Sequence, residues 1–291
     1  MNVLLFYNPK AGTRTFQDDL DLIIEAFQNN GDQIIPHRLK NNEILEAFFK
    51  NTDMETVSKI LVAGGDGTIH QVVNMMMKLG LEKPIGLFPS GTANDFAQYF
   101  EMPRDIEGMI KVALRDTTVK CDIGRANDRY FINVASFGNL VDISQRVNEQ
   151  AKNVLGVLAY YIKGIEEFPR LKSVQARFEM DNETVDEEIF FALVMNGKSA
   201  GGFRKLSPYS EINDGMLDVL IFKKCPMYEI VPLLMQVWNG EHPKSNAIHY
   251  SKTKKVHIEC ANPLISDLDG EMGPELPLDI EVIKGRLEVI K

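Results

Sequence analysis

The first part of the chain, to about residue 115, alternates short apolar runs with longer stretches in which apolar residues recur every three or four positions. Short apolar runs are typical of buried strands, and the longer spacing is typical of helices. Strands that alternate with helices indicate βαβ units and a parallel sheet. We predict strands at 2–7, 33–37, 59–63 and 84–88, and helices at 15–29, 41–51, 69–79 and 104–114.

The pattern changes after Thr117 to strand-like segments separated by Asn, Asp and Gly, which indicates a mainly antiparallel second domain. Helical interruptions are predicted at 143–168 and 226–238. We place a first, α/β domain at 1–118, which the C-terminal residues 285–291 could join, and an all-β domain at 119–284. The predicted strands of the second domain are 119–126, 129–136, 173–180, 188–196, 216–222, 255–260, 278–284 and 286–290.

Composition supports a globular protein of two domains: the chain has 291 residues, of which 44% are hydrophobic and 25% charged. The first residues carry no basic segment or cleavage site typical of a signal peptide. The sequence contains no run of 18 apolar residues, so we predict no transmembrane helix. We therefore expect a cytoplasmic protein. Its three cysteines are far apart, so they predict neither a disulfide framework nor a zinc site.

A net charge of -9 disfavours general binding to nucleic acid or to an anionic membrane, because the overall field repels polyanions. Two local groups of basic residues could act against that average, although solvated surface charge explains them as well. The first group is Lys152, Lys163, Arg170 and Lys172, and the second is the run from Lys252 to Lys255.

The segment KILVAGGDGT, from Lys59 to Thr68, reads as a buried strand that runs through a glycine-rich turn into a helix. Glycines let backbone amides approach a phosphate closely, and a helix N-terminus favours an anion. Asp66 could hold Mg²⁺ or organise the loop, and a plain strand-to-helix turn is the alternative. Neither a Walker A loop nor a dinucleotide fingerprint occurs in the chain.

Two other predicted strands end in polar loops that contain glycine. The segment IGLFPSGTANDF begins at Ile85, and the first strand is followed by Asn8-Pro9-Lys10-Ala11-Gly12. Because parallel strands end at the same edge of a sheet, the three loops could converge on one nucleotide. Thr92 could donate to a phosphate, and Asn94 and Asp95 could fix the loop or a metal ion. Ordinary turn chemistry would explain either loop on its own.

Two acidic turns lie in the second domain. The turn from Asp267 to Glu271 reads DLDGE, and phosphoryl transfer to an alcohol needs a carboxylate near the attacking hydroxyl. Asp269 or Glu271 could be this base, and an acidic β-turn is the alternative. The turn EINDGM, from Glu211 to Met216, has the oxygen donors of a site for a hard cation, but a simple hairpin turn would look the same.

The order GGDGT, PSGTANDFA, INDG and LDGE resembles the diacylglycerol kinase catalytic-domain family, specifically the soluble bacterial lipid kinases related to sphingosine and ceramide kinases. The likeness extends over nearly the whole chain. It implies an N-terminal Rossmann-like domain similar to that of NAD kinases, a C-terminal β-sandwich that binds the lipid, and an ATP site in the cleft between them.

The resemblance also implies roles for individual residues. The catalytic base falls on Asp269, with Glu271 as the close alternative, and Asp66 belongs to the catalytic set. A structural Mg²⁺ would be held by the Asp214 side chain and the backbone carbonyls of Glu211 and Met216. The ATP-binding residues would be Asn8, Pro9, Lys10, Gly12, Gly64, Gly65, Asp66, Gly67, Thr68, Gln71, Gly91, Thr92, Asn94 and Asp95.

The sequence departs from the family in two places. Many relatives have a nucleotide-binding threonine at the end of the second strand, where this chain has His37-Arg38-Leu39-Lys40. Relatives also often continue past the last strand into a helix, whereas this sequence stops at RLEVIK.

By this resemblance the hypothesis is in-line transfer of the γ-phosphoryl group from Mg-ATP to a lipid hydroxyl, most simply that of diacylglycerol, in phospholipid metabolism. We expect a cytoplasmic enzyme that is peripheral at the inner membrane face, contacts the membrane transiently through 159–168 or 201–206, binds no nucleic acid and could form a homodimer. The alternatives are an NAD kinase-like enzyme and a catalytically silent lipid-binding regulator.

Overall fold

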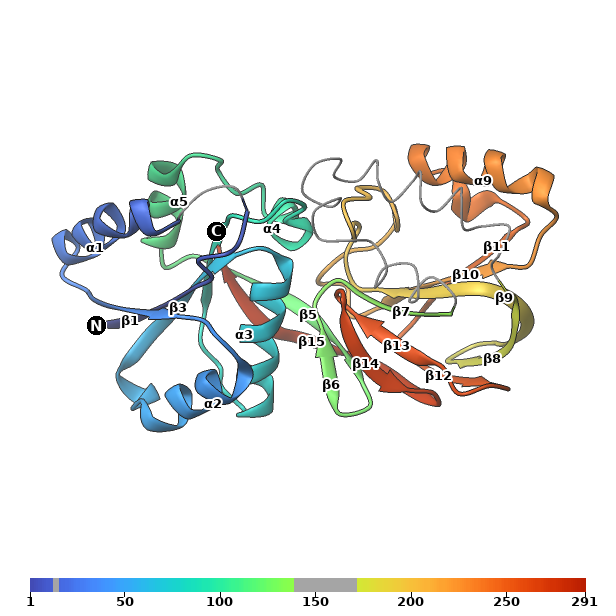
Figure 1. Ribbon diagram of the computed structural model, residues 1–291, viewed down its shortest axis with the longest axis horizontal. Coiled ribbons are helices and arrows are strands. Elements are labelled where there is room, and N and C mark those ends of the chain that lie inside the picture. The colour runs from blue at the N-terminus through green and yellow to red at the C-terminus, as the bar shows by residue number, and fades with distance from the viewer. Residues whose placement is uncertain (13–15, 139–171) are drawn as a thin grey trace. The chain divides into compact units, whose positions relative to one another are not determined.

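The computed structural model describes residues 1–12, 16–138 and 172–291 (Figure 1). These residues form two compact units, each described by itself below. Unit 1 comprises Met1–Cys121 and Gly285–Lys291, and unit 2 comprises Asp122–Lys284. The helix predicted at 143–168, the proposed membrane segment 159–168 and the basic residues Lys152, Lys163 and Arg170 lie outside the described residues.

Unit 1 is built on a parallel sheet, as the alternating pattern predicts. Its strands pair in the order β2-β1-β3-β4, and Val289 near the C-terminus pairs in parallel with Ile85. The middle strands are apolar on both faces because helices cover both sides of the sheet. The strands are β1 (Asn2–Tyr7), β2 (Gln33–Arg38), β3 (Val57–Gly64) and β4 (Ile85–Pro89).

The helices of unit 1 lie in two layers (Figure 1). Helices α1 and α5 pack on one face of the sheet against Val3, Leu5 and Leu61, whereas α2 and α3 cover the other face. Helix α3 begins at Asp66, three residues before the predicted start, because the Gly65 carbonyl already accepts the Thr68 and Ile69 amides. The helices are α1 (Leu20–Asn29), α2 (Asn42–Asn51), α3 (Asp66–Lys78), α4 (Asp95–Tyr99) and α5 (Ile106–Ala113), with short 3-10 turns η1 (Phe16–Asp19) and η2 (Met54–Thr56).

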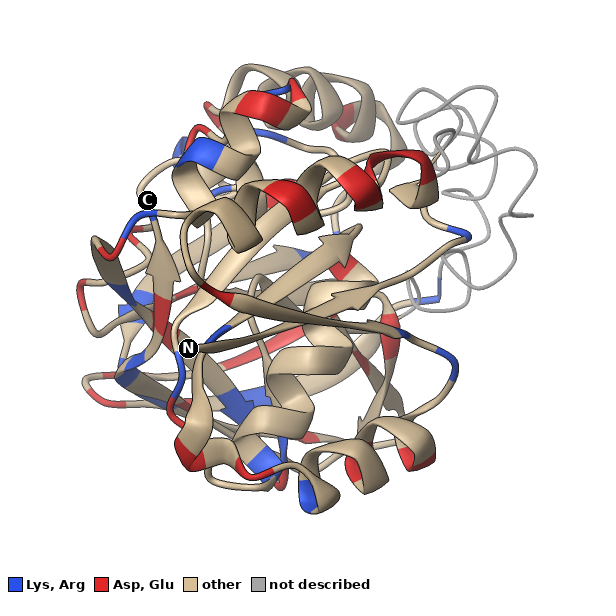
Figure 2. Cartoon of the chain, turned by 90° about the vertical axis from the view of Figure 1, so that its left-hand side faces the viewer, with Lys and Arg blue, Asp and Glu red and all other residues tan. Residues whose placement is uncertain are grey.

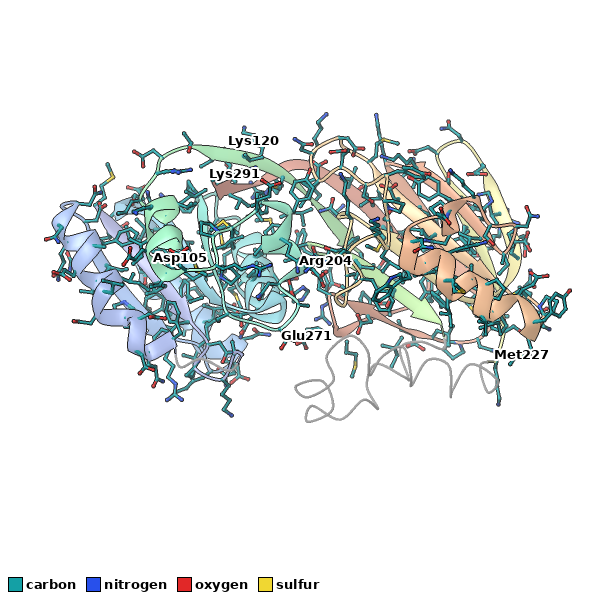
Figure 3. All side chains as sticks on the ribbon, turned by 90° about the horizontal axis from the view of Figure 1, so that it is seen from above. Asp105, Lys120, Arg204, Met227, Glu271 and Lys291 are labelled. Atoms are coloured by element: carbon teal, nitrogen blue, oxygen red, sulfur yellow. The ribbon has the colours of Figure 1, made fainter. Side chains whose placement is uncertain are left out.

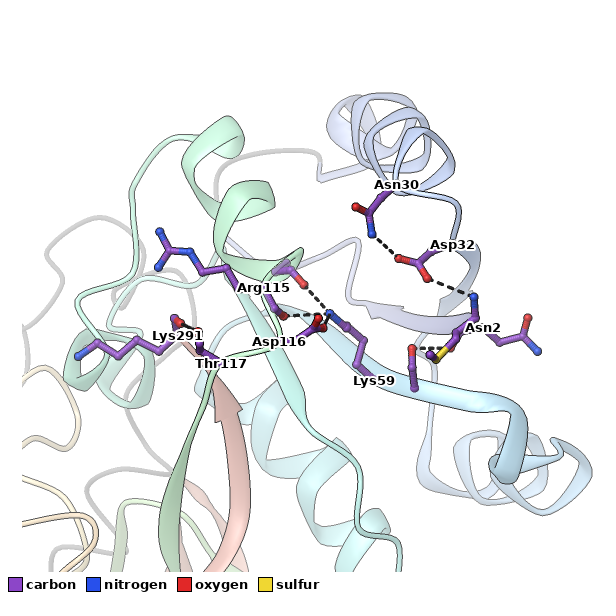
Figure 4. A network of polar contacts seen from close by, with 11 residues as sticks. Asn2, Asn30, Asp32, Lys59, Arg115, Asp116, Thr117 and Lys291 are labelled. Atoms are coloured by element: carbon purple, nitrogen blue, oxygen red, sulfur yellow. Dashed lines mark hydrogen bonds and ion pairs between the residues drawn. The ribbon is translucent and has the colours of Figure 1, made fainter.

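Lys59 is a buried cation at the C-terminal end of α5 (Figure 4). Its ammonium donates to the carbonyls of Ala113 at 3.3 Å and Arg115 at 3.0 Å, and it lies 3.3 Å from Asp116. The last carbonyls of a helix have no partner within the helix, so Lys59 supplies donors to this end. Beside it, Thr117 and Lys291 exchange hydrogen bonds that hold the last residue of the chain in unit 1.

Replacing Lys59 by Met is expected to lower the free energy of unfolding by about 1–3 kcal/mol, because the variant leaves carbonyls at this helix end without a donor. Denaturant unfolding measures the loss. Lys111→Met is the matched control, since Lys111 is an exposed lysine of α5. Equal stability of the two variants would show that Lys59 does not stabilise the helix end.

Unit 2 is mainly antiparallel, as predicted. Strands β14, β13, β7, β9, β8, β12 and β15 pair in that order, and β10 pairs with β9 and β11. By residue number, β5 begins and β15 ends in unit 1, and the other strands belong wholly to unit 2. The described strands are β5 (Thr118–Ala126), β6 (Arg129–Phe131), β7 (Val134–Gly138), β8 (Val174–Met180), β9 (Thr184–Met195), β10 (Leu217–Lys223), β11 (Ile248–Thr253), β12 (Lys255–Cys260), β13 (Ile265–Leu268), β14 (Glu271–Glu275) and β15 (Leu278–Ile290).

Several strand boundaries differ from the sequence prediction. The segment 129–136 is divided between β6 and β7, and the segments 278–284 and 286–290 form one strand, β15, in spite of the left-handed Gly285 between them. The strand continues because its first residues pair with β12 and its last pair with β4. Strands β11, β13 and β14 were not predicted.

Alternate residues of β9 and β10 point into two different apolar clusters. Val194 and Val219 belong to the cluster enclosed by the antiparallel strands. Phe191 and Phe222 stack at 4.0 Å between ring centroids on the opposite side, where helix α9 (Met227–Asn239) packs. This helix matches the one predicted at 226–238. The expected fold class, an α/β parallel sheet plus an all-β domain, is therefore confirmed.

Acidic and basic residues are interspersed on the elements that face the viewer in Figure 2. Helix α1 is an exception, because its only charged residues are Asp21 and Glu25. Within the described residues, no helix is both long enough and apolar enough to cross a membrane.

Candidate functional site

Three predicted loops of unit 1 leave the same edge of the sheet, because β1, β3 and β4 are parallel neighbours. They are the segment after β1 from Asn8 to Gly12, the β3–α3 turn at Gly65 and the β4–α4 loop from Ser90 to Asn94. Backbone bonds join them: the Asn8 amide donates to Ala63 at 2.9 Å, and the Ser90 amide donates to Gly64 at 3.0 Å. The structure thus brings together the three loops that the sequence singles out.

Glycine is required at these junctions because a side chain would clash with neighbouring atoms. A Cβ on Gly12 would lie 1.9 Å from the Ser90 carbonyl oxygen, and a Cβ on Gly91 would lie 2.5 Å from the Gly65 Cα. A Cβ on Gly64 would lie 2.3 Å from the Thr68 hydroxyl oxygen. Gly12 also has a φ of +69°, which side chains rarely adopt.

Side chains fix these loops further. Asp66 accepts the Phe96 amide at 3.0 Å, which ties the first turn of α3 to α4. Asn94, with a φ of 50°, closes its own loop by accepting the Gly91 amide and donating to the Gly91 carbonyl, both at 2.8 Å. Of the two roles predicted for Asp66, the structure supports organisation of the loop.

The predicted ATP-binding residues of unit 1 differ in accessibility. Lys10, Gly67 and Thr92 are exposed, so their donors can reach a ligand. Thr68 is buried, and its hydroxyl oxygen accepts a hydrogen bond from the Asn8 side chain at 3.3 Å. This bond joins the first turn of α3 to the segment after β1. Amides in the first turn of a helix lack partners within the helix and attract phosphate. This edge of unit 1 is therefore suited to bind a phosphate-bearing ligand. The remaining predicted residues lie in the same loops, except Gln71, which donates to Asn42 at 2.9 Å.

In unit 2, the LDGE segment is a tight hairpin between β13 and β14. Asp269 and Gly270 occupy the turn with φ values of 54° and 92°, the combination that two-residue hairpins favour. Asp267 accepts the Gly270 amide at 2.8 Å, and the Asp269 amide donates to Val134 at 2.9 Å. The turn is thus held against the start of β7.

The two candidate bases in this hairpin have different surroundings. The Asp269 carboxylate accepts three backbone amides, from Ile132 at 2.7 Å, Asn133 at 2.8 Å and Val134 at 2.9 Å. A carboxylate offers about four lone-pair positions, so little of Asp269 remains for a substrate hydroxyl. Glu271, labelled in Figure 3, is exposed. Its carboxylate accepts no hydrogen bond from any residue that the structure describes.

The INDG turn lies in a group of carboxylates around one lysine. Asp214 accepts the Met216 amide and the Lys252 ammonium, both at 2.9 Å. Asp218, almost fully buried, lies 3.8 Å from the same ammonium, and buried Asp122 accepts the Gly215 amide at 2.6 Å. Sequence reasoning missed Asp122 and Asp218 and treated Lys252 as surface charge. The available signal was an aspartate inside each of two predicted strands, 119–126 and 216–222, of which only the second is otherwise apolar.

Burial raises the pKa of Asp218, and the hydrogen bond from Tyr250 and the charge of Lys252 lower it in part. Burial and the hydrogen bond to Asp218 raise the pKa of Tyr250, so its phenol stays protonated. The pair therefore depends on Lys252 for compensating positive charge.

The three Mg²⁺ ligands that the resemblance implies, Glu211, Asp214 and Met216, all belong to this turn. Within the described ranges, no three His, Cys, Asp or Glu side chains converge to hold a metal ion. The Asp214 carboxylate and the backbone carbonyls of Glu211 and Met216 are nevertheless hard oxygen donors of the type that Mg²⁺ prefers. Lys252 shows that this carboxylate attracts a cation. The donor set fits Mg²⁺, which would have to compete with the lysine.

Lys252→Met is expected to destabilise the protein at pH 7 by about 1–2 kcal/mol, a value reduced because Lys252 is partly exposed. The pKa of folded Asp218 lies above its ordinary 3.8, so ionisation of Asp218 opposes folding, and more strongly without the lysine. The deficit should therefore shrink as the pH falls through the folded pKa.

Urea unfolding at several pH values, with and without Mg²⁺, measures this effect. Mg²⁺ should restore part of the lost stability if the donors hold it. Lys254→Met, at an exposed lysine two residues away, is the control and should respond to neither change. A deficit that is constant with pH would contradict the role of Asp218.

Comparison with known proteins agrees with this architecture. The profile of the diacylglycerol kinase catalytic domain matches residues 2–126, and that of the YegS C-terminal NAD kinase beta sandwich-like domain matches residues 133–291. The diacylglycerol kinase of Bacillus subtilis (strain 168) is 35% identical over 278 residues, which cover 94% of this chain and 90% of the relative. That of Staphylococcus carnosus (strain TM300) is 32% identical, with 98% and 93% covered.

Solved structures show the same fold. A candidate diacylglycerol kinase from Bacillus anthracis str. Sterne is 26% identical, with a TM-score of 0.85 over 99% of this chain and 96% of the other. The two units and these matches define a lipid kinase. The chain belongs to the diacylglycerol kinase family.

Proposed function

We propose that the protein transfers the γ-phosphoryl group of ATP to the free hydroxyl of diacylglycerol, which gives phosphatidic acid and ADP. The observation that carries the nucleotide half of this proposal is the joined set of glycine loops in unit 1, where Gly12, Gly65 and Gly91 allow backbones to meet. Relatives that match over nearly the whole chain are named diacylglycerol kinases, which supports diacylglycerol as the acceptor.

On this proposal the amides at the start of α3 and the exposed Thr92 and Lys10 bind the phosphates. Positioning and neutralisation of charge are the main contributions of a protein to phosphoryl transfer. Asp66 contributes indirectly, because its bond to the Phe96 amide holds two of the loops together.

For the acceptor, we propose that Glu271 removes the hydroxyl proton and that Asp269 positions the hairpin. The three amides that Asp269 accepts support this division, as does the exposed carboxylate of Glu271. The sequence alone left both residues open as the base, and the family resemblance favoured Asp269 with Glu271 as the alternative. A general base needs a lone pair within reach of the proton that it takes.

Mg²⁺, held by Asp214 and the carbonyls of Glu211 and Met216, would supply positive charge within unit 2. Asp122, which accepts the Gly215 amide, and Lys252, which donates to Asp214, would keep that turn in place. Cytoplasmic location at the inner membrane face, phospholipid metabolism as the role and a homodimer stay predictions.

Incubation with γ-labelled ATP and vesicles tests the proposal. Diacylglycerol should become labelled in the organic phase, whereas sphingoid bases, undecaprenol and phosphatidylglycerol in parallel vesicles should take up less label. Label in another of these lipids would identify that lipid, and not diacylglycerol, as the acceptor. Labelled NADP, formed when NAD is offered in place of lipid, would identify an NAD kinase. No labelled product with any acceptor would favour a silent lipid-binding protein.

A further inference from the structure

Asn196 is a buried amide side chain directly after β9. Only 1% of its surface is exposed. Its Nδ2 donates to two backbone carbonyls, that of Asp122 in β5 at 2.9 Å and that of Ile132 at 2.8 Å. These carbonyls lie 74 and 64 residues away along the chain. One side chain therefore joins the end of β9 to β5 and to the segment between β6 and β7.

The backbone of Asn196 adds a second bond to the segment between β6 and β7. The β7–β9 ladder starts at the pair of Val134 and Met195, and just beyond this pair the Asn196 amide donates to the Asn133 carbonyl at 2.8 Å. A buried polar group normally has a partner, because leaving it unpaired costs free energy. Asn196 thus provides partners for the carbonyls of both residues that precede β7, Ile132 and Asn133.

The two carbonyls that Asn196 binds belong to the peptide groups that hold Asp269. The Ile132 carbonyl shares a peptide group with the Asn133 amide, and the Asn133 carbonyl shares one with the Val134 amide. In a trans peptide the carbonyl and the amide point in opposite directions. On the amide side, Oδ1 of Asp269 accepts both groups, at 2.8 and 2.9 Å. Each peptide group is therefore bound at both ends, by Asn196 and by Asp269.

This arrangement fixes the orientation of the two peptide groups. Hydrogen bonds that follow one another in a chain polarise and strengthen each other, and in a protein interior each bond is stronger than in water. Without the Nδ2 donor of Asn196, the carbonyls of Asp122 and Ile132 lose a partner, and a buried group that loses its partner is destabilised. Rotation of the peptide group after Ile132 would relieve this cost, but it would also turn the Asn133 amide away from Asp269.

We propose that Asn196 is a positioning residue for phosphoryl transfer. It orients the peptide groups of 132–134 that hold Asp269, and through Asp269 it fixes the hairpin that carries Glu271. The inference rests on the proposed function, which assigns the removal of the hydroxyl proton to Glu271. Asn196 needs no contact with the substrate, because it acts through Asp269. Its effect is large because a displacement of about 1 Å in a positioned group can lower a rate by about 10²-fold.

Asn196→Leu removes the side-chain donor and keeps a side chain of similar size. The Asn196 Oδ1 accepts no bond within the described residues, so the variant loses only donated bonds. Its kcat should fall by about 10–100-fold. The KM for ATP should not change, because the partners of Asn196 named above all belong to unit 2. If this variant does not fold, Asn196→Ser, which only reduces the volume of the side chain, takes its place in the same measurements.

Ile258→Ala is the matched control for a general loss of stability. Ile258 is fully buried in the apolar cluster enclosed by the antiparallel strands, and its backbone pairs with Phe178 and Leu278, far along the chain from 132–134. The control should unfold more easily than the unchanged protein but keep its kcat. Equal kcat values in Asn196→Leu and Ile258→Ala would overturn the proposal.

A double variant shows whether Asn196 acts through Glu271. When Glu271→Gln is already present, Asn196→Leu should lower kcat no further, because the group that Asn196 positions has lost its function. Losses that multiply would mean that Asn196 affects the reaction by another route, and they would overturn the proposal.

Hydrogen exchange of backbone amides, followed by NMR, tests the peptide groups without any phosphoryl transfer. In Asn196→Leu the Asn133 and Val134 amides should exchange faster, on the order of tenfold or more, and Ile258→Ala should change them less. Exchange of both amides at the rate of the unchanged protein would overturn the proposal. Faster exchange in a protein that phosphorylates no lipid would support the hold of Asn196 on 132–134 and would count against the proposed function alone.

Discussion

Glu271→Gln is expected to lower turnover by about 10²–10⁴-fold, the usual contribution of a general base. Gln keeps the size of Glu but cannot accept the proton of the acceptor hydroxyl. The thermal unfolding midpoint should not change, because the Glu271 carboxylate is exposed and accepts no hydrogen bond within the described part of the chain. Steady-state kinetics and thermal unfolding of the same preparation measure both effects.

Glu275→Gln is the control for this variant, since Glu275 is another exposed glutamate of β14. Asp269→Asn should behave differently from both. It weakens bonds from three backbone amides, and hydrogen bonds to a charged group contribute about 1.5–3 kcal/mol each. A stable but inactive Asp269→Asn beside an active Glu271→Gln would assign the base to Asp269.

Gly12→Ala is expected to reduce turnover by about 10²-fold, the effect of a displacement near 1 Å in a positioning group. The added Cβ would lie 1.9 Å from the Ser90 carbonyl oxygen, so the two loops must move apart. ATP affinity should fall with turnover. Titration with a fluorescent nucleotide analogue measures the affinity, and initial rates measure turnover.

Gly80→Ala separates this clash from backbone strain. Gly80 has a φ of +67°, close to the +69° of Gly12, but no atom lies within 4 Å of the added Cβ. Both variants should lose about 1–2 kcal/mol of stability from the left-handed conformation. Only Gly12→Ala should lose ATP binding, and equal losses in both variants would mean that contact between the loops is unimportant.

The sequence predicted unit 1 well because its middle strands contain fully apolar runs. Runs such as VLLF from Val3 and ILVA from Ile60 are buried on both faces, so hydrophobicity alone marks them. The three glycine loops were found for a related reason, since each follows such a strand directly. In unit 2 the same rule failed at β13 and β14, whose four and five residues include Asp267, Glu271 and Pro274.

Tertiary contacts explain what the sequence could not show about the candidate site. Asp269 binds amides at 132–134, and nothing in either segment indicates that the two meet. Likewise, the bond between Asp122 and the Gly215 amide joins strand β5 to the INDG turn across a separation of 93 residues. Thr68 read as a phosphate ligand, yet packing against Gly64 buries it. A residue type can be read from the sequence, whereas its partners depend on the complete fold.

The most direct test of the central claim is product analysis after reaction of ATP with diacylglycerol in vesicles, by mass spectrometry of the lipid and assay of ADP. We predict one phosphatidic acid for each ADP formed, with neither product in Glu271→Gln. ADP without phosphorylated lipid, or phosphate on a lipid other than diacylglycerol, would contradict the proposed reaction.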